Sequence, residues 1–399
     1  MTMRTSIPLN CLLFLLPLSL PLAADQPPSN FADRQKPYFA LLKVEEAWKI
    51  TRGGADCKIG VIDSGFDFFH PALRANLQPG WFAPGFYHTD FFSMDAHGTE
   101  VSSLIAARRK DGEDGMWGMA PDCTIVTASQ GMPMHKLIQF QRQFFARNPK
   151  ATMADFQKEM AAHKTELQAF GDAWLDYVSE TTDESLRYLA DQGVRVINFS
   201  AFLDLSVAKS KPEFKARLEA AFNYAKQKDV LIVLGAGNNN QRVTEYPGDR
   251  TFVLIAGAST LADQRWTMTA KMKGMEIKQG SCFGPRLSVV APIENIVVAA
   301  PHEEAYYNWK DTPMGEQKAD FEGLYSVRPW GATSCAAPQV AALAALVRTI
   351  RPDLKAAEVI RLIEEGADAI GSPGFHEETG YGRINYLRTL ELARDAVSQ

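Results

Sequence analysis

The chain has 399 residues, enough for one large domain or two ordinary ones. Hydrophobic residues make up 46% of the sequence and charged residues 22%, a balance that allows a sizeable buried core. The formal net charge is -5 and no long run of lysine and arginine occurs, so no nucleic-acid partner is expected. No Cys-x-x-Cys pair or Cys/His cluster has metal-ligand spacing, so no metal site is expected either.

The first 24 residues differ in composition from the rest of the chain. Arg4 precedes an apolar run from Cys11 to Leu22, and Ala23 and Ala24 follow it. This pattern is typical of a signal peptide over residues 1–24; the alternative is an anchor that stays attached. We therefore expect an exported protein, secreted or periplasmic, with no stable membrane insertion after cleavage. Residues 25–40 are polar and contain proline, which indicates an N-terminal arm.

Short β-branched runs alternate with helical patterns along the remaining chain. The run from Lys58 to Asp63 (KIGVID) predicts a strand buried on both faces. Similar runs lie at 124–127, 194–198, 230–234, 252–256 and 287–290, and helices are expected at 44–49, 99–108, 183–192, 211–228, 335–350 and 355–365. The alternation predicts an α/β fold, a parallel β-sheet with helices on both faces and functional sites at the carboxyl ends of its strands.

Residues 131–180 interrupt this alternation. They are rich in Gln, Lys, Glu and Phe at helical spacing, and the strand pattern resumes after them. We interpret them as a helical insertion within a single domain that covers residues 41–395.

Three residues combine into a candidate catalytic set. Asp63 ends the first predicted strand, His97 opens a helical pattern, and Ser334 stands at the start of an alanine-rich helix. Each alone is ordinary: a turn-capping aspartate, a capping or surface histidine and a serine at a helix N-terminus. Together they match a known chemistry, because a histidine can take the proton of a serine hydroxyl while a carboxylate fixes the imidazole tautomer. The chain order Asp, His, Ser is that of the subtilisin arrangement.

Longer motifs surround these residues, and through them the sequence resembles the subtilisin-like serine proteases, or subtilases, over residues 40–390. The segments that carry the resemblance are IGVIDSGFDFFHPAL (59–73), HGTEVSSLIAA (97–107), GMAP (118–121), VINFS (196–200), GAGN (235–238), YPG (246–248), FGPRLSVVAP (283–292) and GATSCAAPQVAALAALV (331–347). The resemblance implies a serine endopeptidase that hydrolyses peptide bonds of polypeptide substrates through an acyl-enzyme, with a peptidase domain at 41–395.

The resemblance also assigns the residues around the triad. Asn238 would donate its side-chain amide to the oxyanion. Substrate-binding positions would be Ser200, Ala201, Phe202, Gly235, Ala236 and Gly237. His70 matches a structural position of the first motif. Glu100 stands where many members carry a second histidine, and we expect it to be a solvated or helix-start carboxylate.

The sequence departs from the family pattern at three places. Ala332 replaces a glycine two positions before Ser334, Cys335 replaces a common methionine and should be a small core residue, and Ala201 and Phe202 follow Ser200 where the family usually has a glycine that walls the pocket. These departures keep two alternatives open. One is a non-catalytic or weakly active peptide-binding protein with this fold. The other is an esterase or peptide ligase that uses the same triad.

No cofactor is required by this chemistry. Because many relatives bind calcium, the resemblance allows a calcium site, for which the only hint is Asp111, Glu113 and Asp114; such a trio is more often a solvated loop. The usual inhibitory pro-domain has no counterpart before residue 41, which would leave room for a separate folding helper or inhibitor.

Two cysteines are candidates for a disulfide. In the family the strands that follow Cys57 and Cys123 are neighbours, so the resemblance brings the two residues to the same end of adjacent strands. The alternative is a pair of buried free thiols. Cys282 and Cys335 are expected to be free.

Overall fold

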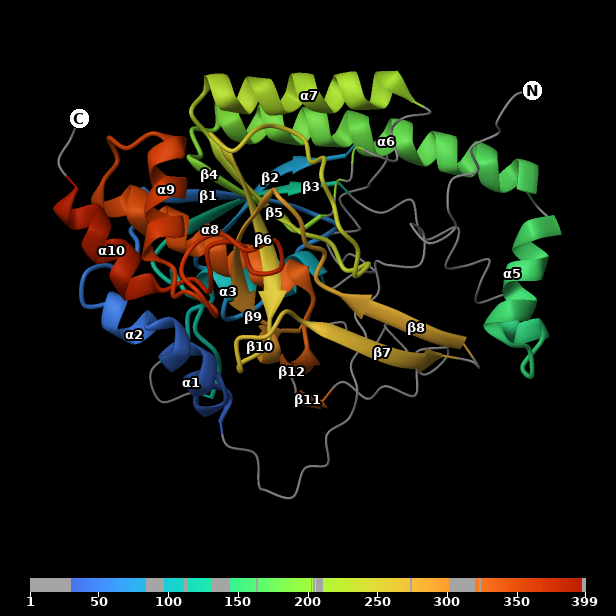
Figure 1. Cartoon of the computed structure of the whole chain (residues 1–399), viewed down its shortest axis with the longest axis horizontal. Coiled ribbons are helices and arrows are strands. Elements are labelled where there is room, and N and C mark those ends of the chain that lie inside the picture. The colour runs from blue at the N-terminus through green and yellow to red at the C-terminus, as the bar shows by residue number, and fades with distance from the viewer. Residues whose placement is uncertain are drawn as a thin grey trace.

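A seven-stranded sheet forms the centre of the structure, a computed structural model that describes residues 30–83, 97–110, 114–130, 144–162, 164–201, 203, 205, 211–272, 275–300, 320–322 and 324–396. The strands lie in the order β2-β3-β1-β4-β5-β6-β9, and every neighbouring pair is parallel (Figure 1). Their bounds are β1 Lys58–Asp63, β2 Leu77–Phe82, β3 Thr124–Ser129, β4 Val196–Phe199, β5 Leu231–Gly235, β6 Val253–Ser259 and β9 Leu287–Pro292. The predicted fold class is confirmed.

Helices cover both faces of this sheet. On one face lie α6 (Lys164–Asp191) and α7 (Pro212–Gln227), and on the other lie α3 (His97–Ala106) and α8 (Thr333–Ile350) (Figure 1). The approach of α6 is close, because a Cβ added to Gly60 of β1 would stand 2.9 Å from Leu189 Cδ1 of α6. Among the described residues, α8 is the one helix long and apolar enough to cross a membrane, but 83% of it is buried inside the protein. It is the central core helix.

Smaller elements surround the central layers. A second sheet has the order β10-β12-β11 and is antiparallel, with bounds β10 Glu294–Ala299, β11 Asp320–Glu322 and β12 Tyr325–Trp330. A hairpin joins β7 (Thr267–Met272) to β8 (Met275–Gly280). The remaining helices are α1 Phe31–Leu42, α2 Val44–Ala47, α5 Met153–Ala162, α9 Ala356–Gly366 and α10 Tyr386–Asp395.

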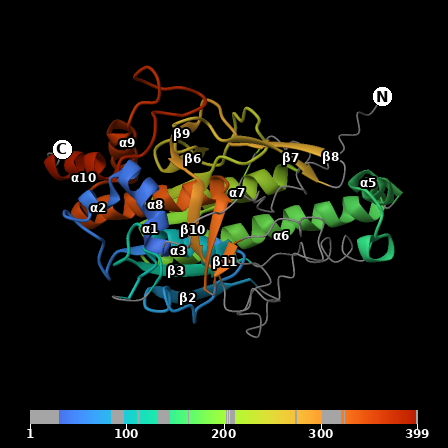
Figure 2. The ribbon, with the colours of Figure 1, turned by 90° about the horizontal axis from the view of Figure 1, so that it is seen from below.

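The predicted N-terminal arm at 25–40 includes the first helix of the described structure. Asn30 caps α1, since its side chain accepts a hydrogen bond from the Asp33 N–H at 2.9 Å. Tyr38 and Phe39 are buried in the main core, and α1 lies alongside β10 and α2 (Figure 2). The expected boundary between residues 40 and 41 therefore falls inside α1. The charged residues on one face of this helix obscure, in the sequence, the apolar residues that its other face places at helical spacing.

Where it is described, the predicted insertion at 131–180 is helical at 144–147, in α5 and in the first part of α6, whereas residues 148–152 are not helical. Residues 131–143 and 163 lie outside the described residues, as does the predicted signal peptide at 1–24. The expected end of the insertion at residue 180 is not a boundary, because α6 continues through it for 28 residues and packs against β1 and β3. Its C-terminal half is one of the layer helices of the domain.

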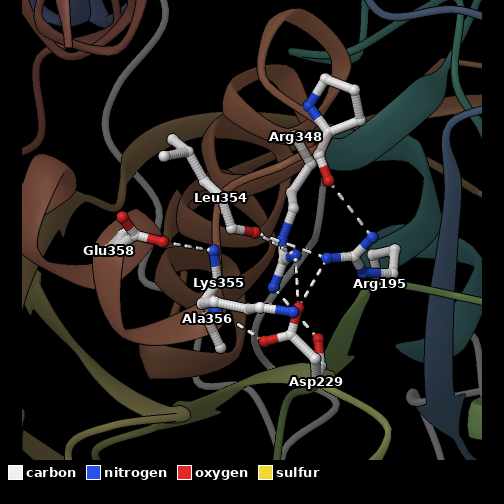
Figure 3. Close-up of polar contacts among 8 residues, drawn as sticks. Arg195, Asp229, Arg348, Leu354, Lys355, Ala356 and Glu358 are labelled. Carbon is white, nitrogen blue, oxygen red and sulfur yellow. Dashed lines mark hydrogen bonds and ion pairs between the residues drawn. The ribbon is translucent and has the colours of Figure 1, made fainter. Parts of the chain in front are cut away.

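An ionic cluster ties four elements together at the end of the sheet opposite the catalytic candidates. The Asp229 carboxylate, in the turn between α7 and β5, accepts hydrogen bonds from Arg195 Nη2 at 2.6 Å and Arg348 Nη1 at 3.0 Å (Figure 3). The backbone N–H of Ala356, at the start of α9, also donates to Asp229 at 2.9 Å. Asp229 has a φ of 56°, a left-handed conformation that Asp and Asn tolerate better than most residues.

Candidate active site

Asp63 and His97 meet at the carboxyl end of β1. His97 Nδ1 lies 2.8 Å from Asp63 Oδ1, and the same oxygen accepts the Ser64 N–H at 2.7 Å. The Asp63 side chain is only 4% exposed, whereas that of His97 is 28% exposed. A carboxylate held by a backbone N–H presents a fixed partner to the imidazole, so Nδ1 carries the proton and Nε2 is the basic nitrogen.

Gly98 permits this approach. A Cβ at Gly98 would stand 2.2 Å from the Gly65 carbonyl oxygen and 3.1 Å from Asp63 Cβ. The backbone at the start of α3 therefore packs directly on the turn after β1. Any larger residue at position 98 would push His97 away from Asp63.

Ser334 lies in the first turn of α8. Ala332 precedes the helix with φ -136° and ψ -173°, an extended conformation that any residue adopts, so the methyl group in place of glycine imposes no backbone strain. The backbone N–H groups of a first helical turn have no partner within the helix, and the helix dipole there favours negative charge. A serine at this position can attack a carbonyl group, and the backbone N–H groups can stabilise the oxyanion that forms.

Ser334 and Ser200 exchange two hydrogen bonds. The Ser334 hydroxyl donates to the Ser200 carbonyl at 3.1 Å, and the Ser200 hydroxyl donates to the Ser334 carbonyl at 3.1 Å. Asn198, which is fully buried on β4, donates its amide to the Ser200 hydroxyl at 2.9 Å. This chain of contacts fixes the nucleophile helix against the end of β4.

Asn238 is oriented by Thr333. The Asn238 Oδ1 accepts the Thr333 N–H at 3.0 Å and the Thr333 hydroxyl at 2.9 Å. A backbone N–H can only donate, so the oxygen of the amide must face Thr333 and its NH₂ group must point the other way. Gly237, with φ 99°, supplies the left-handed turn that brings Asn238 to this place, and its own N–H donates to the Thr333 hydroxyl at 3.2 Å.

The sequence-predicted residues thus gather at one edge of the sheet. β1, β4 and β5 are adjacent strands, and Asp63, Ser200 and Asn238 lie at or just beyond their carboxyl ends. Of the expected substrate-binding positions, Gly235 and Gly237 contact Thr333, Ala236 is fully buried, Ala201 is partly buried, and Phe202 lies outside the described residues.

His70 and Cys335 have the structural positions expected of them. His70 is fully buried, accepts the Ala72 N–H through Nδ1 at 3.2 Å, and lies with Nε2 2.8 Å from the Leu324 carbonyl. Burial raises the pKa of the Cys335 thiol to about 12, so the thiol stays protonated and is no rival nucleophile.

The expected helix-start position of Glu100 is confirmed, but the expectation of a solvated carboxylate is wrong. Glu100 is in the first turn of α3, but it is 7% exposed and forms an ion pair with Arg328 of β12, which is 6% exposed. A carboxylate in a first helical turn is usually solvated, and only the tertiary contact with β12 supplies the buried partner.

The four cysteines of the described structure are all free thiols. Cys57 and Cys123 do lie side by side, because Lys58 pairs with Thr124 in the parallel register and the two thiols share a hydrogen bond that lowers the pKa of Cys57 and raises that of Cys123. The predicted neighbourhood is therefore present, and the bond between the sulfurs stays a prediction.

The described residues hold no group of three or more His, Cys, Asp and Glu side chains arranged for a metal ion. Asp111 and Glu113 lie outside the described residues. Asp114 accepts the backbone N–H groups of Phe31 and Gly115, each at 2.8 Å.

Three residues of the site were not identified from the sequence: Thr333, Asn198 and Arg328. Thr333 is next to Ser334, and Asn198 is two positions before Ser200, both within motifs of the family. Their closeness in sequence to these serines could have identified them. Arg328 lies in a segment without any motif, and its contact with Glu100 spans 228 positions.

Comparisons with known proteins agree with this geometry. The model of the subtilase family matches residues 54–382. The chain is 28% identical over 341 residues to a thermophilic serine proteinase of Bacillus sp. (strain AK1), which covers 85% of this chain and 63% of that relative. It is 28% identical over 368 residues to mycosin-4 of Mycobacterium tuberculosis, which covers 90% of this chain and 69% of mycosin-4.

A solved structure shares the fold. The MycP3 protease from the type VII (ESX-3) secretion system has a TM-score of 0.57 at 26% identity, with 89% of this chain and 87% of that chain covered. The chain spans less than two thirds of the Bacillus relative, and 42% of a probable subtilase-type serine protease of Deinococcus radiodurans. Because the family model matches most of its length, the chain belongs to the subtilase family.

Proposed function

We propose that the chain is an exported serine endopeptidase that hydrolyses peptide bonds with Asp63, His97 and Ser334 as its catalytic triad. The observation that carries the proposal is the 2.8 Å contact between His97 Nδ1 and Asp63 at the same sheet edge as Ser334. It supports an imidazole whose Nε2 is available as a general base. The membership of the family supports the same chemistry.

In the proposed mechanism the Ser334 hydroxyl leaves the Ser200 carbonyl and donates to His97. Rotation about χ1 of Ser334 would release its hydroxyl from the Ser200 carbonyl, and catalytic hydrogen bonds often form only when substrate binds. Ser334 Oγ then forms a bond to the scissile carbonyl carbon while His97 Nε2 takes its proton. Asp63 stabilises the imidazolium that results.

The oxyanion of the tetrahedral intermediate receives two donors. One is the Asn238 NH₂ group, which points away from Thr333 because the amide oxygen accepts the Thr333 N–H. The other is the backbone N–H of Ser334 at the start of α8. His97 then gives its proton to the leaving amine, the peptide bond breaks, and an ester joins Ser334 to the acyl part. Water, deprotonated by His97, hydrolyses this ester and restores the enzyme.

Labelling with a fluorophosphonate probe tests the proposal. An activated serine becomes covalently labelled, and Ser334→Ala should abolish both labelling and peptide hydrolysis while the variant keeps its fold. A purified wild-type protein that resists the probe would support the non-catalytic peptide-binding alternative. Peptide and ester substrates, assayed side by side, distinguish the endopeptidase from an esterase or ligase.

Export is the second part of the proposal. Its support is the N-terminal sequence, with Arg4 before the apolar run and Ala23 and Ala24 after it. Expression in a bacterial host followed by fractionation and N-terminal sequencing should give a mature protein that begins near residue 25. A cytoplasmic protein that still begins at Met1 would contradict it.

A further inference from the structure

A buried ion pair joins the helix of His97 to the strand that leads to Ser334. Glu100 follows His97 by three positions, so the two side chains are neighbours on α3. Arg328 precedes Ser334 by six positions and lies on β12. The side chains of Glu100 and Arg328 are 10% and 8% exposed, and they form a direct salt bridge.

Backbone contacts support the same junction. The Ser103 hydroxyl donates to the Glu100 carbonyl at 2.7 Å and accepts the Ala299 N–H at 3.0 Å, which fastens α3 to the end of β10. Directly after β12, the Gly331 N–H donates to the Ile293 carbonyl at 2.7 Å. The second sheet is thus held on one side to the base-bearing helix and continues on the other into the nucleophile segment.

Both charges also reach the residue next to the nucleophile. The pKa of Cys335 is raised mainly by burial and further by the charge of Glu100, whereas the charge of Arg328 lowers it. Gly331 permits the tight contact here, because a Cβ at that position would stand 2.7 Å from Cys335 Sγ. Glu100 and Arg328 therefore lie close enough to the first turn of α8 for their charges to act on Cys335.

We propose that Glu100 and Arg328 are positioning residues that hold His97 and Ser334 in register and balance the charge beside the imidazole. The inference rests on the proposed function and adds two residues to it. A buried ion pair is weak evidence for stability, because an apolar pair of similar volume often does as well. A pair retained between the two elements that carry the base and the nucleophile is instead suited to fixing their distance, where a shift of 1 Å can cost about 100-fold in rate.

The charges give the proposal a specific signature in the pH profile. The acid limb of kcat/KM reports the pKa of His97 in the free enzyme, since only neutral His97 can act as base. The described charged or titratable groups that bear on this profile are Asp63, which contacts His97 from β1, Glu100 on the same helix as His97, Arg328, which pairs with Glu100 from β12, and Cys335 on α8, whose pKa both of these charges affect. Of these, Glu100 and Arg328 can be altered without removing a triad member.

Single substitutions should move the acid limb in opposite directions. Glu100→Gln leaves the Arg328 charge uncompensated, which disfavours the imidazolium, lowers the pKa of His97 and moves the limb to lower pH. Arg328→Gln leaves the carboxylate uncompensated, which raises the pKa of His97 and moves the limb to higher pH. For each single variant we expect the acid limb to shift by about 0.5–1 pH unit. Arg328→Lys keeps the charge and should leave the limb where the wild type has it.

The rate per active site is the second readout. With active sites counted by fluorophosphonate titration, each Gln variant should lose about tenfold in kcat with KM nearly unchanged, because the misplacement acts on the transition state. The matched control is Asp229→Asn, which disrupts another buried arginine pair far from the triad. It should lower stability but leave kcat per active site and the pH profile unchanged.

The double variant Glu100→Gln with Arg328→Gln keeps the test decisive if a single variant fails to fold. It removes both charges together, so its acid limb should return to the wild-type position while kcat stays reduced. Wild-type kcat per active site in the double variant, or acid limbs that do not move in the folded single variants, would overturn the proposal. Wild-type enzyme that resists the fluorophosphonate would instead contradict the proposed function itself.

Discussion

Asn238 is the residue whose orientation depends most clearly on a neighbour. The Thr333 N–H and hydroxyl both donate to the amide oxygen, so the NH₂ group must point away from Thr333. A donor oriented before substrate binds costs no reorganisation when charge develops on the oxyanion. We therefore expect both residues to act on the transition state and neither to act on substrate affinity.

Replacing Asn238 by Ala should lower kcat by about 10²–10³-fold, the range observed when one oxyanion-hole donor is removed. KM should change little, because the interaction is made mainly in the transition state. Steady-state kinetics on a peptide substrate measure both constants. A large increase in KM with kcat preserved would show that Asn238 binds the ground state.

Thr333→Val is the companion variant. It keeps the size of the side chain and the backbone N–H but removes the hydroxyl bond to Asn238, worth about 1 kcal/mol net. The loss in kcat should be about fivefold, smaller than that of Asn238→Ala. In the Asn238→Ala background the same substitution should have no further effect, and an additive loss would mean that Thr333 acts independently of Asn238.

Among the elements, β1 and β3 carry a cysteine pair at their starts. Their register places Cys57 beside Cys123, and the Thr124 N–H donates to the Cys57 carbonyl at 3.0 Å. The lowered pKa of Cys57 favours its thiolate, the form that attacks a disulfide of an oxidoreductase before Cys123 resolves the mixed disulfide. Both steps need only the two thiols and a disulfide oxidant of the exported compartment.

We predict that the protein, once exported as proposed above, contains a Cys57–Cys123 disulfide. Alkylation of the unreduced, denatured protein followed by peptide mass mapping should leave both residues unmodified, whereas Cys282 and Cys335 should be alkylated. The bridge should add about 4 kcal/mol of stability in the chain-entropy model. Alkylation of Cys57 and Cys123 would rule the bridge out.

The Asp229 cluster makes a stability prediction that involves α8, α9 and the turn before β5. Arg348 has a side chain that is 3% exposed, so removing the carboxylate leaves a buried charge without its ion-pair partner. Asp229→Asn, which preserves the left-handed turn, should cost about 3–5 kcal/mol of unfolding free energy. Urea unfolding monitored by circular dichroism provides the measurement. A change below about 1 kcal/mol would mean that the cluster is a solvated surface network.

For the whole molecule, α1 is part of the core. Gln35 is 2% exposed, and it donates to the Trp117 carbonyl and accepts the Trp117 N–H, both at 2.8 Å. The Arg52 guanidinium lies over the rings of Trp48 and Trp117, 4.8 and 4.7 Å from their centroids. The segment before β1 therefore closes the same apolar core that surrounds α3.

Phe39→Ala tests this role of α1. Phe39 is 4% exposed, and removing its ring should leave a cavity that costs about 3–5 kcal/mol of stability. Lys36→Ala, on the exposed side of the same helix, should change stability by less than about 0.5 kcal/mol. Comparable small effects of both substitutions on the denaturation midpoint would contradict the assignment of α1 to the core.

The central strands and the polar residues at their ends could be predicted because their signals are local. The expected strand at 58–63 matches β1, since a short β-branched run has few alternatives to a buried parallel strand. The β2 strand was missed, because Pro79 and Gly80 interrupt its pattern. The register shifts there, and Gly80 is needed because a Cβ would stand 2.1 Å from the Thr127 carbonyl oxygen.

The sequence by itself determined the family resemblance, the parallel α/β class and the residues Asp63, His97, Ser334 and Asn238 as candidates, because each lies in a short motif with its own local geometry. Only the tertiary structure decided which side chains meet across the chain. The burial of Glu100 against Arg328, the docking of α1 and the orientation of Asn238 by Thr333 all depend on packing between elements, and such contacts leave no periodic signal in the sequence.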